Sequence, residues 1–259
     1  MVKKSGRELL CVDVGNTSIS IGEFKAGRIK RAWRYSRVKF PEFVPLFKKF
    51  VRLSPKCNVV ISSVVPDITP KIRKIVGKNG WIIGENLKIG LPHKYIPLKR
   101  LGNDRLANAY GGLRTYGAPL LILDFGTALT CDYISGKGVF EGGLIIPGPE
   151  IAWEALTEKA AQLPKLSFPR HVKKSFLVGR DTRSGMEQGI LQAYGSLTDG
   201  LIERFRKQYG RNLRTVATGG LARVIYPFTR KVDLLDPFLT LKSLALAFLE
   251  SASPHKKTH

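Results

Sequence analysis

The chain opens with apolar patterns that predict strands before any helix. Residues 9–14 (LLCVDV) are apolar up to an aspartate, residues 18–24 (SISIGEF) alternate, and residues 28–35 (RIKRAWRY) alternate again after a short turn. These patterns are typical of β-strands joined in tight hairpins. Residues 41–53 place apolar side chains at helical spacing behind Pro41, which suits the start of a helix.

Strands and helices then alternate. A strand is expected at residues 57–65, a helix at 68–77, a strand at 80–84, and a helix that starts after Gly102. The apolar strand segments are bounded by Pro and Gly, which mark turns.

The same order returns in the second half of the chain. Leu9, Leu10, Asp13 and Gly15 align with Leu120, Leu121, Asp124 and Gly126 at a constant offset of 111 residues. The elements expected there are strands at 120–125, 129–134 and 140–146, helices at 150–161 and (as one or two segments) 179–210, a strand at 213–220, and a closing helix at 239–251. Strands followed by alternating helices, twice over, indicate a duplicated α/β protein. We expect domains of residues 1–117 and 118–259.

Each repeat begins with a strand that ends in a carboxylate and small polar residues. Asp13 is followed by Gly15-Asn16-Thr17, and Asp124 by Gly126-Thr127. Glycine lets the backbone approach a ligand closely, and N–H and hydroxyl groups can donate to phosphate oxygens. A neighbouring carboxylate suits Mg²⁺, which keeps much of its water shell. One such turn is often only a strand end, but two in register predict a nucleotide site.

Two further segments carry candidate chemistry. Gly102-Asn103-Asp104-Arg105 lies between the repeats, at the start of a helix, where anions are favoured. Asp104 is a candidate general base and Arg105 an anion clamp, although an aspartate in a first turn also stabilises a helix by itself. Thr218-Gly219-Gly220 ends a strand and leaves room for a flat ring or a ribose, although such turns are common.

Composition narrows the class of protein. Of 259 residues, 43% are apolar, which is enough for a core. No apolar run reaches the roughly 18 residues of a membrane span, and the N-terminal segment lacks the features of a signal peptide. Cys11 and Cys131 lie in apolar strands and are expected as buried free thiols. We therefore expect a cytoplasmic protein without a membrane partner.

The net charge is +23, from 43 basic and 20 acidic residues. Such a charge raises the possibility of nucleic-acid binding or of steering an anionic substrate. The basic residues are scattered along the sequence, and no zinc-finger spacing, RNA-binding aromatic motif or long basic helix accompanies them. We interpret the charge as a dispersed surface property, and specific nucleic-acid binding is not expected.

An ordered set of motifs resembles the type III pantothenate kinase family, within the acetate and sugar kinase/Hsp70/actin superfamily. The motifs are DVGNTS, GNDR, DFGTALTCDY, EGGLIIPG, GRDT and ATGGLA, and the resemblance spans about residues 9–249. It implies duplicated ribonuclease H-like (actin-like ATPase) domains with a nucleotide cleft between them. It also implies phosphorylation of pantothenate by ATP to 4'-phosphopantothenate, the first step of coenzyme A biosynthesis, and a homodimer.

The resemblance also implies roles for individual residues. Asp104 is the proton acceptor. The substrate pantothenate is contacted by Tyr95, Gly102, Asn103, Asp104, Arg105 and Thr182. ATP is contacted by Asp13, Val14, Gly15, Asn16, Thr17, Thr127, Thr218, Gly219 and Gly220. Asp13 holds Mg²⁺ through water, and Asp124 binds a monovalent cation, K⁺ or NH₄⁺.

The sequence departs from the family pattern at two positions and in its charge. Asn103 replaces the usual alanine of Gly-Ala-Asp-Arg, and we expect it to be tolerated. Ser243 replaces a glycine in the closing helix, at a position expected to lie away from the site. Two rival functions stay open: a transcriptional accessory factor, as some family members are described, and a nucleic-acid-binding protein without kinase activity. The intact Asp104 favours the kinase.

Overall fold

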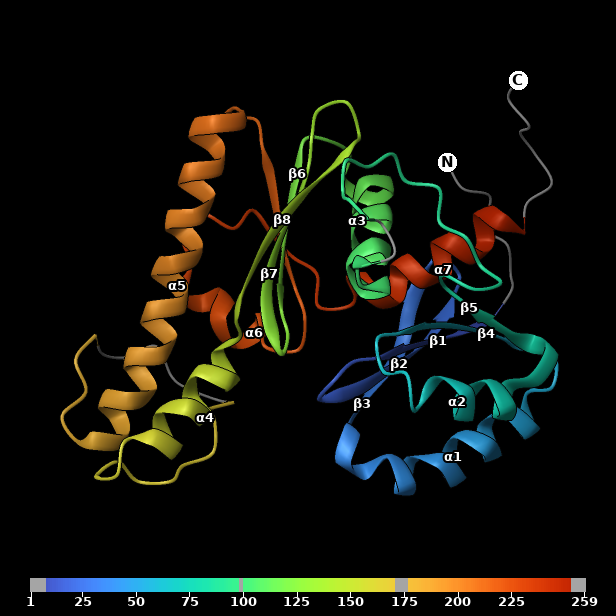
Figure 1. The fold of residues 1–259 in the computed structure, drawn as a ribbon, viewed down its shortest axis with the longest axis horizontal. Coiled ribbons are helices and arrows are strands. Elements are labelled where there is room, and N and C mark those ends of the chain that lie inside the picture. The colour runs from blue at the N-terminus through green and yellow to red at the C-terminus, as the bar shows by residue number, and fades with distance from the viewer. Residues whose placement is uncertain (1–7, 98–99, 171–176, 253–259) are drawn as a thin grey trace. The chain divides into compact units, whose positions relative to one another are not determined.

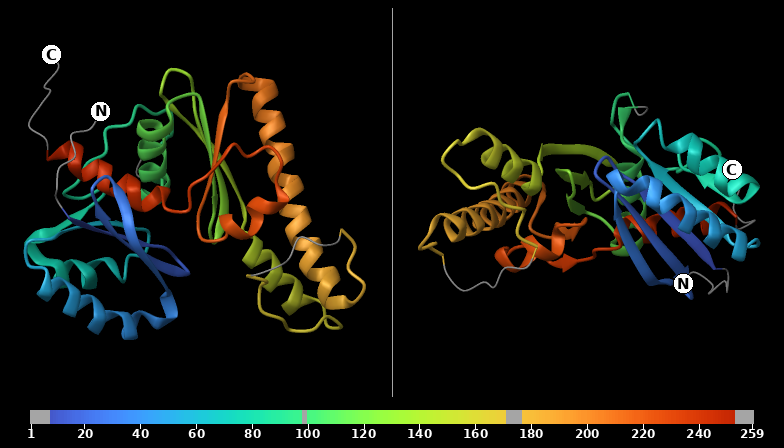
Figure 2. Two further views of the ribbon diagram at one scale, coloured as in Figure 1. Left: turned by 180° about the vertical axis from the view of Figure 1, so that it is seen from behind. Right: turned by 90° about the horizontal axis from the view of Figure 1, so that it is seen from below.

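The computed structural model describes residues 8–97, 100–170 and 177–252. The chain divides into two compact α/β units, drawn in Figures 1 and 2, and each is described by itself. Unit 1 comprises Met1–Leu91, Tyr95–Thr115 and Phe238–His259, and unit 2 comprises Pro92–Lys94 and Tyr116–Pro237. No helix within the described ranges has both the length and the apolar composition of a membrane span.

Unit 1 is a mixed five-stranded sheet with helices on both faces. Its strands, in the spatial order β3-β2-β1-β4-β5, are β1 (Leu9–Val14), β2 (Ser18–Lys25), β3 (Arg28–Ser36), β4 (Asn58–Ser63) and β5 (Gly80–Ile82). β1 pairs antiparallel with β2 and parallel with β4. The helices are α1 (Phe40–Leu53), α2 (Thr69–Val76), α3 (Asn103–Tyr116) and α7 (Leu239–Ser251), with short 3₁₀ segments η1 (Arg37–Lys39) and η2 (Gly77–Asn79).

The core of unit 1 follows from alternation along β1. Leu10 and Val12 pack in a cluster with the apolar side chains of α1 and α2. Leu9 and Cys11 point to the opposite face, in a cluster with side chains of α3 and α7. Successive residues of a strand face opposite sides of a sheet, so a strand that is apolar at nearly every position is buried on both faces.

Unit 2 is a second mixed five-stranded sheet. Its strands, in the order β8-β7-β6-β9-β10, are β6 (Leu120–Phe125), β7 (Ala128–Ile134), β8 (Phe140–Pro147), β9 (Arg214–Thr218) and β10 (Leu234–Leu235). Its helices are α4 (Pro149–Lys159), α5 (Thr182–Tyr209) and α6 (Ala222–Ile225), followed by the 3₁₀ segment η4 (Tyr226–Phe228). Alternate residues of β6, including Leu121 and Leu123, form a core with Trp153 of α4 and Leu191 of α5.

The two sheets share strand order, strand directions and even an irregularity. In unit 1 the register of β2 and β3 shifts between Glu23 and Phe24. In unit 2 the register of β7 and β8 shifts between Tyr133 and Ile134, at the corresponding position. Correspondence down to this register shift confirms the duplication expected from the repeated sequence pattern.

The expected elements are all present, with additions. The region at 179–210 forms one long helix, α5, which begins at Thr182 because Asp181 accepts the N–H of Ser184 in a capping box. The short elements α6 and β10 were not expected. Cys11 and Cys131 are buried and form no disulfide, as expected.

The division into units differs from the expected domains in one element. The main break, between Thr115 and Tyr116, lies close to the expected boundary at 117/118, but α7 belongs to unit 1. The apolar side chains of α7, among them Leu241 and Leu244, pack in a cluster with Leu9 and Cys11 of β1. The closing helix therefore completes the core of the unit in which the chain began.

Candidate functional site

In unit 1, candidate residues gather at the carboxyl ends of the parallel strands β1 and β4. Asp13 pairs with Ser62 in the strand register, so both side chains lie on the same face as Cys11. Ser62 is 0% exposed, and its hydroxyl has no hydrogen-bond partner. A carboxylate and an unsatisfied hydroxyl thus lie beside the Gly15–Thr17 loop, at the sheet edge where α/β proteins commonly bind ligands.

The first turn of α3 is fixed at the same edge of unit 1. The Nδ2 of Asn103 donates to the carbonyl of Ile83 at 3.0 Å and to that of Ser63 at 3.4 Å. Gly84 has a φ of +85°, and a Cβ at this position would lie 3.0 Å from Oδ1 of Asn103. Asn103 is therefore more than a tolerated replacement for alanine, because its amide ties α3 to the strand ends.

Asp104 lies at this helix start, and its carboxylate occupies the space beside Gly102, two residues earlier. Its Oδ1 accepts the N–H of Arg105 at 2.8 Å, and a Cβ on Gly102 would lie 2.4 Å from the same oxygen. Burial raises the pKa of Asp104, while the N–H and the positive charge of Arg105 act in the opposite direction. A carboxyl with a raised pKa at the edge of the candidate site suits a general base.

Arg105 supplies a buried cation next to Asp104. The residue is 7% exposed, and its guanidinium carbon lies 5.6 Å from the centre of the Tyr95 ring. Unit 1 thus brings together Tyr95, Gly102, Asn103, Asp104 and Arg105, which were predicted to line the substrate site. A guanidinium held against an aromatic ring is well placed to bind a carboxylate.

In unit 2, the corresponding edge carries Asp124 and Thr218. They pair in the register of β6 and β9, as Asp13 and Ser62 do in unit 1. Thr218 is 0% exposed and its hydroxyl has no hydrogen-bond partner. Gly219 has a φ of +95°, and a Cβ there would lie 2.3 Å from Oδ1 of Asp124. The residue after β9 is glycine because the Asp124 carboxylate occupies the space that a side chain would need.

The second hairpin loop is held by the residue that precedes α4. The N–H of Gly148 donates to the carbonyl of Thr127 at 3.1 Å. A Cβ on Gly148 would lie 2.3 Å from that oxygen, so no side chain fits. The hydroxyl of Tyr194 on α5 donates to the carbonyl of Pro147 at 2.7 Å, which fixes the end of β8.

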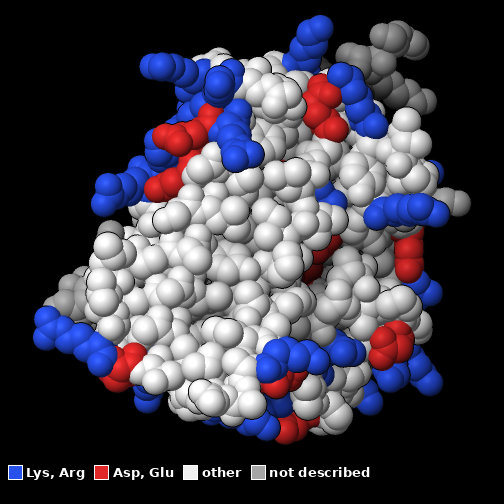
Figure 3. All heavy atoms as spheres, turned by 60° about the vertical axis from the view of Figure 1, so that its left-hand side comes forward, with Lys and Arg blue, Asp and Glu red and all other residues white. Residues whose placement is uncertain are grey.

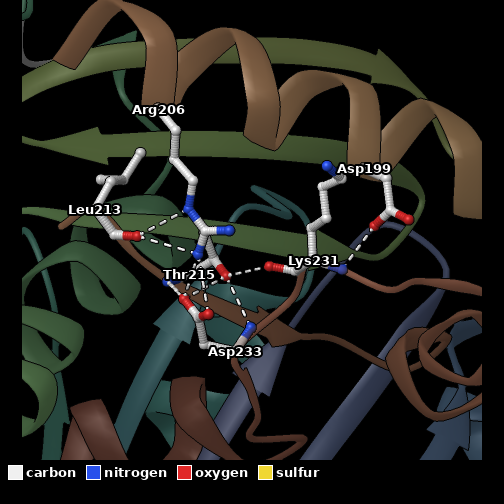
Figure 4. Close-up of polar contacts among 6 residues, drawn as sticks. All are labelled: Asp199, Arg206, Leu213, Thr215, Lys231 and Asp233. Atoms are coloured by element: carbon white, nitrogen blue, oxygen red, sulfur yellow. Dashed lines mark hydrogen bonds and ion pairs between the residues drawn. The ribbon is translucent and has the colours of Figure 1, made fainter. Parts of the chain in front are cut away.

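A polar network fixes the beginning of β9, whose end carries Thr218, Gly219 and Gly220 (Figure 4). Arg206 donates to both carboxylate oxygens of Asp233, at 2.9 and 2.8 Å. The N–H of Thr215 donates to Asp233 at 2.8 Å, and the N–H of Asp233 donates to the Thr215 hydroxyl at 2.8 Å. This reciprocal pairing holds β9 and the segment before β10 against α5.

Thr182 lies in unit 2 at the start of a helix, whereas Asp124 and Thr218 lie at strand ends. It is the first residue of α5, is exposed, and follows the capping residue Asp181. Gly179 is needed just before it, since a Cβ there would lie 2.2 Å from the backbone nitrogen of Gly185. The GRDT motif is therefore a compact helix start.

Sequence reasoning missed Ser62 and Gly148. Ser62 corresponds to Thr218, since each pairs with the strand-ending aspartate of its own repeat, but this correspondence exists only in the strand pairing and gives no signal in the sequence. Ser243, expected away from the site, is buried on α7, and a Cβ on Gly111 of α3 would lie 1.9 Å from its hydroxyl. Ser243 thus packs against the helix that begins with Asn103.

Comparisons with known proteins agree with this arrangement. Solved structures of similar fold include a Campylobacter jejuni protein with a provisional assignment as a Baf family transcriptional activator, at 18% identity and a TM-score of 0.57, over 94% of this chain and 98% of that chain. The ethanolamine utilization protein EutJ of Carboxydothermus hydrogenoformans matches at 13% identity and a TM-score of 0.55, over 93% and 90%.

The Lmo2764 protein of Listeria monocytogenes, provisionally assigned as an N-acetylmannosamine kinase, matches at 10% identity and a TM-score of 0.54, over 95% of this chain and 100% of that chain. At these identities the likeness shows the fold alone, and it confirms two α/β units of the actin-like ATPase fold. The model of the type III pantothenate kinase family matches residues 9–204, which is more than half of the sequence. The chain therefore belongs to the type III pantothenate kinase family.

Proposed function

We propose that this protein transfers the γ-phosphoryl group of ATP to the primary hydroxyl of pantothenate, giving 4'-phosphopantothenate. The observation that carries the proposal is the start of α3, where Asp104 with a raised pKa lies beside the buried cation Arg105. The family match supports it. Phosphoryl transfer needs positioning and charge neutralisation more than covalent help from the protein.

On the acceptor side, Asp104 takes the proton of the attacking hydroxyl. Arg105, held against Tyr95, binds the pantothenate carboxylate, and Gly102 and Asn103 shape the floor of the site. Thr182 contributes a hydroxyl from the start of α5. A pantothenate analogue without its carboxylate should lose affinity, because the charge-assisted hydrogen bonds from Arg105 to that carboxylate would be lost.

On the ATP side, Asp13, Val14, Gly15, Asn16 and Thr17 contact the phosphates from unit 1. The contacts from unit 2 come from Thr127, Thr218, Gly219 and Gly220. Backbone N–H groups and hydroxyls in such loops donate to phosphate oxygens, and the close glycines let the chain approach them.

The oxygen donors at the two strand ends fit the implied cations. Asp13 with the unsatisfied Ser62 hydroxyl suits Mg²⁺ held through water, and Asp124 with the unsatisfied Thr218 hydroxyl suits K⁺ or NH₄⁺. No cluster of three or more His, Cys, Asp and Glu occurs within the described ranges. These ions would neutralise the charge on the transferring phosphoryl group.

A homodimer is part of the proposal, and the outer side of α5 supports it. Gly185, Gly189, Ala193, Ser196 and Leu197 are all exposed, and α5 has no charged residue from Gln188 to Thr198. Figure 3 shows a broad uncharged area on the side where α4 and α5 lie. An exposed face of this kind is typical of a subunit interface. Gly189→Arg should convert a dimer to a monomer in sedimentation equilibrium.

One observation favours a second candidate, a transcriptional accessory factor: the Campylobacter jejuni structure with the Baf family assignment. The arrangement around Asp104 favours the kinase, because a regulator has no need of a base with a raised pKa. A cytoplasmic location stays a prediction.

The test is a coupled assay with ATP, Mg²⁺ and pantothenate, run in K⁺ and again in Na⁺. Turnover that depends on pantothenate and falls by about 10²–10⁴ in Asp104→Asn is expected. Asp67→Asn makes the same substitution at an exposed position of unit 1 and should retain activity. Absence of pantothenate-dependent turnover in the wild-type protein would refute the proposal.

A further inference from the structure

The two hairpin loops are anchored from the same position of each repeat. In unit 1 the residue after β3 is Arg37, whose N–H donates to the carbonyl of Thr17 at 2.8 Å. In unit 2 the residue after β8 is Gly148, whose N–H donates to Thr127 in the same way. Arg37 and Gly148 are 111 residues apart, the offset that also relates the two strand-ending aspartates. The backbone anchor is therefore part of the duplicated unit.

The loops themselves differ in length by one residue. The N–H of Gly15 donates to the carbonyl of Ser18 at 2.9 Å, and the N–H of Gly126 donates to that of Ala128 at 3.0 Å. The first loop thus closes over one more residue than the second, and that additional residue is Asn16.

The anchoring side chains differ accordingly. In the shorter loop, a Cβ on Gly148 would lie 2.5 Å from the carbonyl oxygen of Gly126, so the backbone fills the space. In the longer loop, Nε of Arg37 donates to the carbonyl of Asn16. The guanidinium therefore satisfies the carbonyl that the additional residue introduces, and both carbonyls of Asn16 and Thr17 are held toward Arg37.

Holding these carbonyls sets the direction of the loop's peptide groups. In a trans peptide the C=O and the following N–H point in opposite directions. With the Asn16 carbonyl held by Arg37, the N–H of Thr17 points to the other side of the loop. Phosphate-binding loops depend on N–H groups fixed in this manner.

We propose that Arg37 is a positioning residue of the first phosphate loop, and that its Nε–H fixes the Asn16 peptide for binding the phosphates of a nucleoside triphosphate. The inference rests on the proposed role of the Gly15–Thr17 loop in ATP binding. It does not depend on which alcohol accepts the phosphoryl group.

Three variants separate the hydrogen bond from the charge. In Arg37→Gln, Nε2 lies at the same number of bonds from the backbone as Nε of arginine, so the donor stays and the charge goes. Arg37→Met places a methyl group at that point and removes both. Arg31→Met is the control for charge, because it also removes one positive charge. Arg31 is an exposed residue of β3 that pairs with Glu23 in the strand register rather than with the loop.

Binding of ATP is measured by titration calorimetry without pantothenate, together with KM for each substrate and Tm without nucleotide. Arg37→Met should weaken ATP binding about tenfold or more, as expected for losing a hydrogen bond to a charged donor. Arg37→Gln and Arg31→Met should stay within about threefold of wild type, and KM for pantothenate should not change.

The inference is overturned if Arg37→Gln binds ATP as weakly as Arg37→Met, since charge alone would then explain the loss. It is also overturned if Arg37→Met binds like wild type, if Arg31→Met loses as much, or if Tm falls with no selective change for ATP. A wild-type protein that binds ATP without phosphorylating pantothenate would refute the proposed function, and the variant series would still decide the role of Arg37. A wild-type protein that binds no ATP would refute both.

Discussion

Replacing Gly219 by alanine should destabilise unit 2, with a cost that follows from two features of the turn after β9. The backbone has a φ of +95°, and the new Cβ would lie 2.3 Å from Oδ1 of Asp124 and 2.7 Å from the nitrogen and oxygen of Phe125. A left-handed conformation costs a non-glycine residue about 1–2 kcal/mol, and overpacking adds about 1–3 kcal/mol. We expect a loss of about 2–5 kcal/mol in the free energy of unfolding.

Thermal unfolding followed by calorimetry measures this loss. For a chain of this size, 1 kcal/mol lowers Tm by about 2–4 °C, so a decrease of at least about 4 °C is expected. The matched control is Gly136→Ala, also in unit 2, where a Cβ meets no atom within 4 Å and φ is not positive. That variant should unfold within about 2 °C of wild type.

The same substitution tests the assignment of the Asp124 edge. A Cβ on Gly219 displaces the Asp124 carboxylate, so affinity for ATP and the response to K⁺ should fall together in Gly219→Ala. A variant with wild-type Tm and an unchanged K⁺ response would show that the glycine is not required by the carboxylate, and the reasoning would fail.

Four further predictions concern catalysis, stability and charge. Because Asp104 acts unprotonated and its pKa is raised by burial, kcat/KM should fall with decreasing pH at values above the ordinary aspartate pKa of about 3.9; an acid limb at or below that value would contradict the assignment. Because the folded state favours the protonated form of Asp104, the free energy of unfolding falls as pH rises through the folded-state pKa. Asp104→Asn removes this cost and should have a higher Tm than wild type at pH 8 in thermal scans. Asp124→Ala should lose rate and the preference for K⁺ over Na⁺, and full wild-type activity in Na⁺ alone would count against a cation at this carboxylate. The described residues of unit 1 include 20 Lys and Arg and 8 Asp and Glu, and those of unit 2 include 15 and 12. Because this charge attracts anionic substrates and is screened by salt, kcat/KM should fall modestly as KCl is raised beyond saturation while kcat stays flat. Duplex DNA should bind only in the non-specific range of about 10⁻⁴–10⁻⁶ M at about 0.15 M salt, and nanomolar binding of one DNA sequence would be the contrary result.

The basic residues are divided unevenly between the two units. The scattered basic residues along the sequence predicted a dispersed surface charge, and 20 of the 35 Lys and Arg among the described residues belong to unit 1. The assignment could not be read from the sequence, because unit 1 is assembled from three separate segments, including the last helix.

Most of the fold could be predicted from local patterns. Alternation and continuous apolar runs located the strands of both repeats, and the recurring Asp-x-Gly located the two hairpins, because these signals depend on residues close together in the chain. The short elements β10 and α6 could not be found this way, since two to four residues carry too little periodicity and depend on contacts with β9 and α5.

The candidate site shows the same division. Asp13, Asp104 and Asp124 stood out because each is a carboxylate at the end or start of a recognisable element. Ser62, Gly148 and Arg37 looked ordinary in the sequence. Each acts on a residue from a different strand or loop, so its environment exists only after the strands pair.

Tertiary structure also decided the protonation behaviour of Asp104. Its position at a helix start was readable from the chain, and a near-normal pKa would have been sufficient for its role. Burial raises that pKa, and the carboxylate becomes buried only when the chain folds. The sequence determines which functional groups lie at the end or start of each element. The ionisation and orientation of these groups depend on neighbours that only folding brings close.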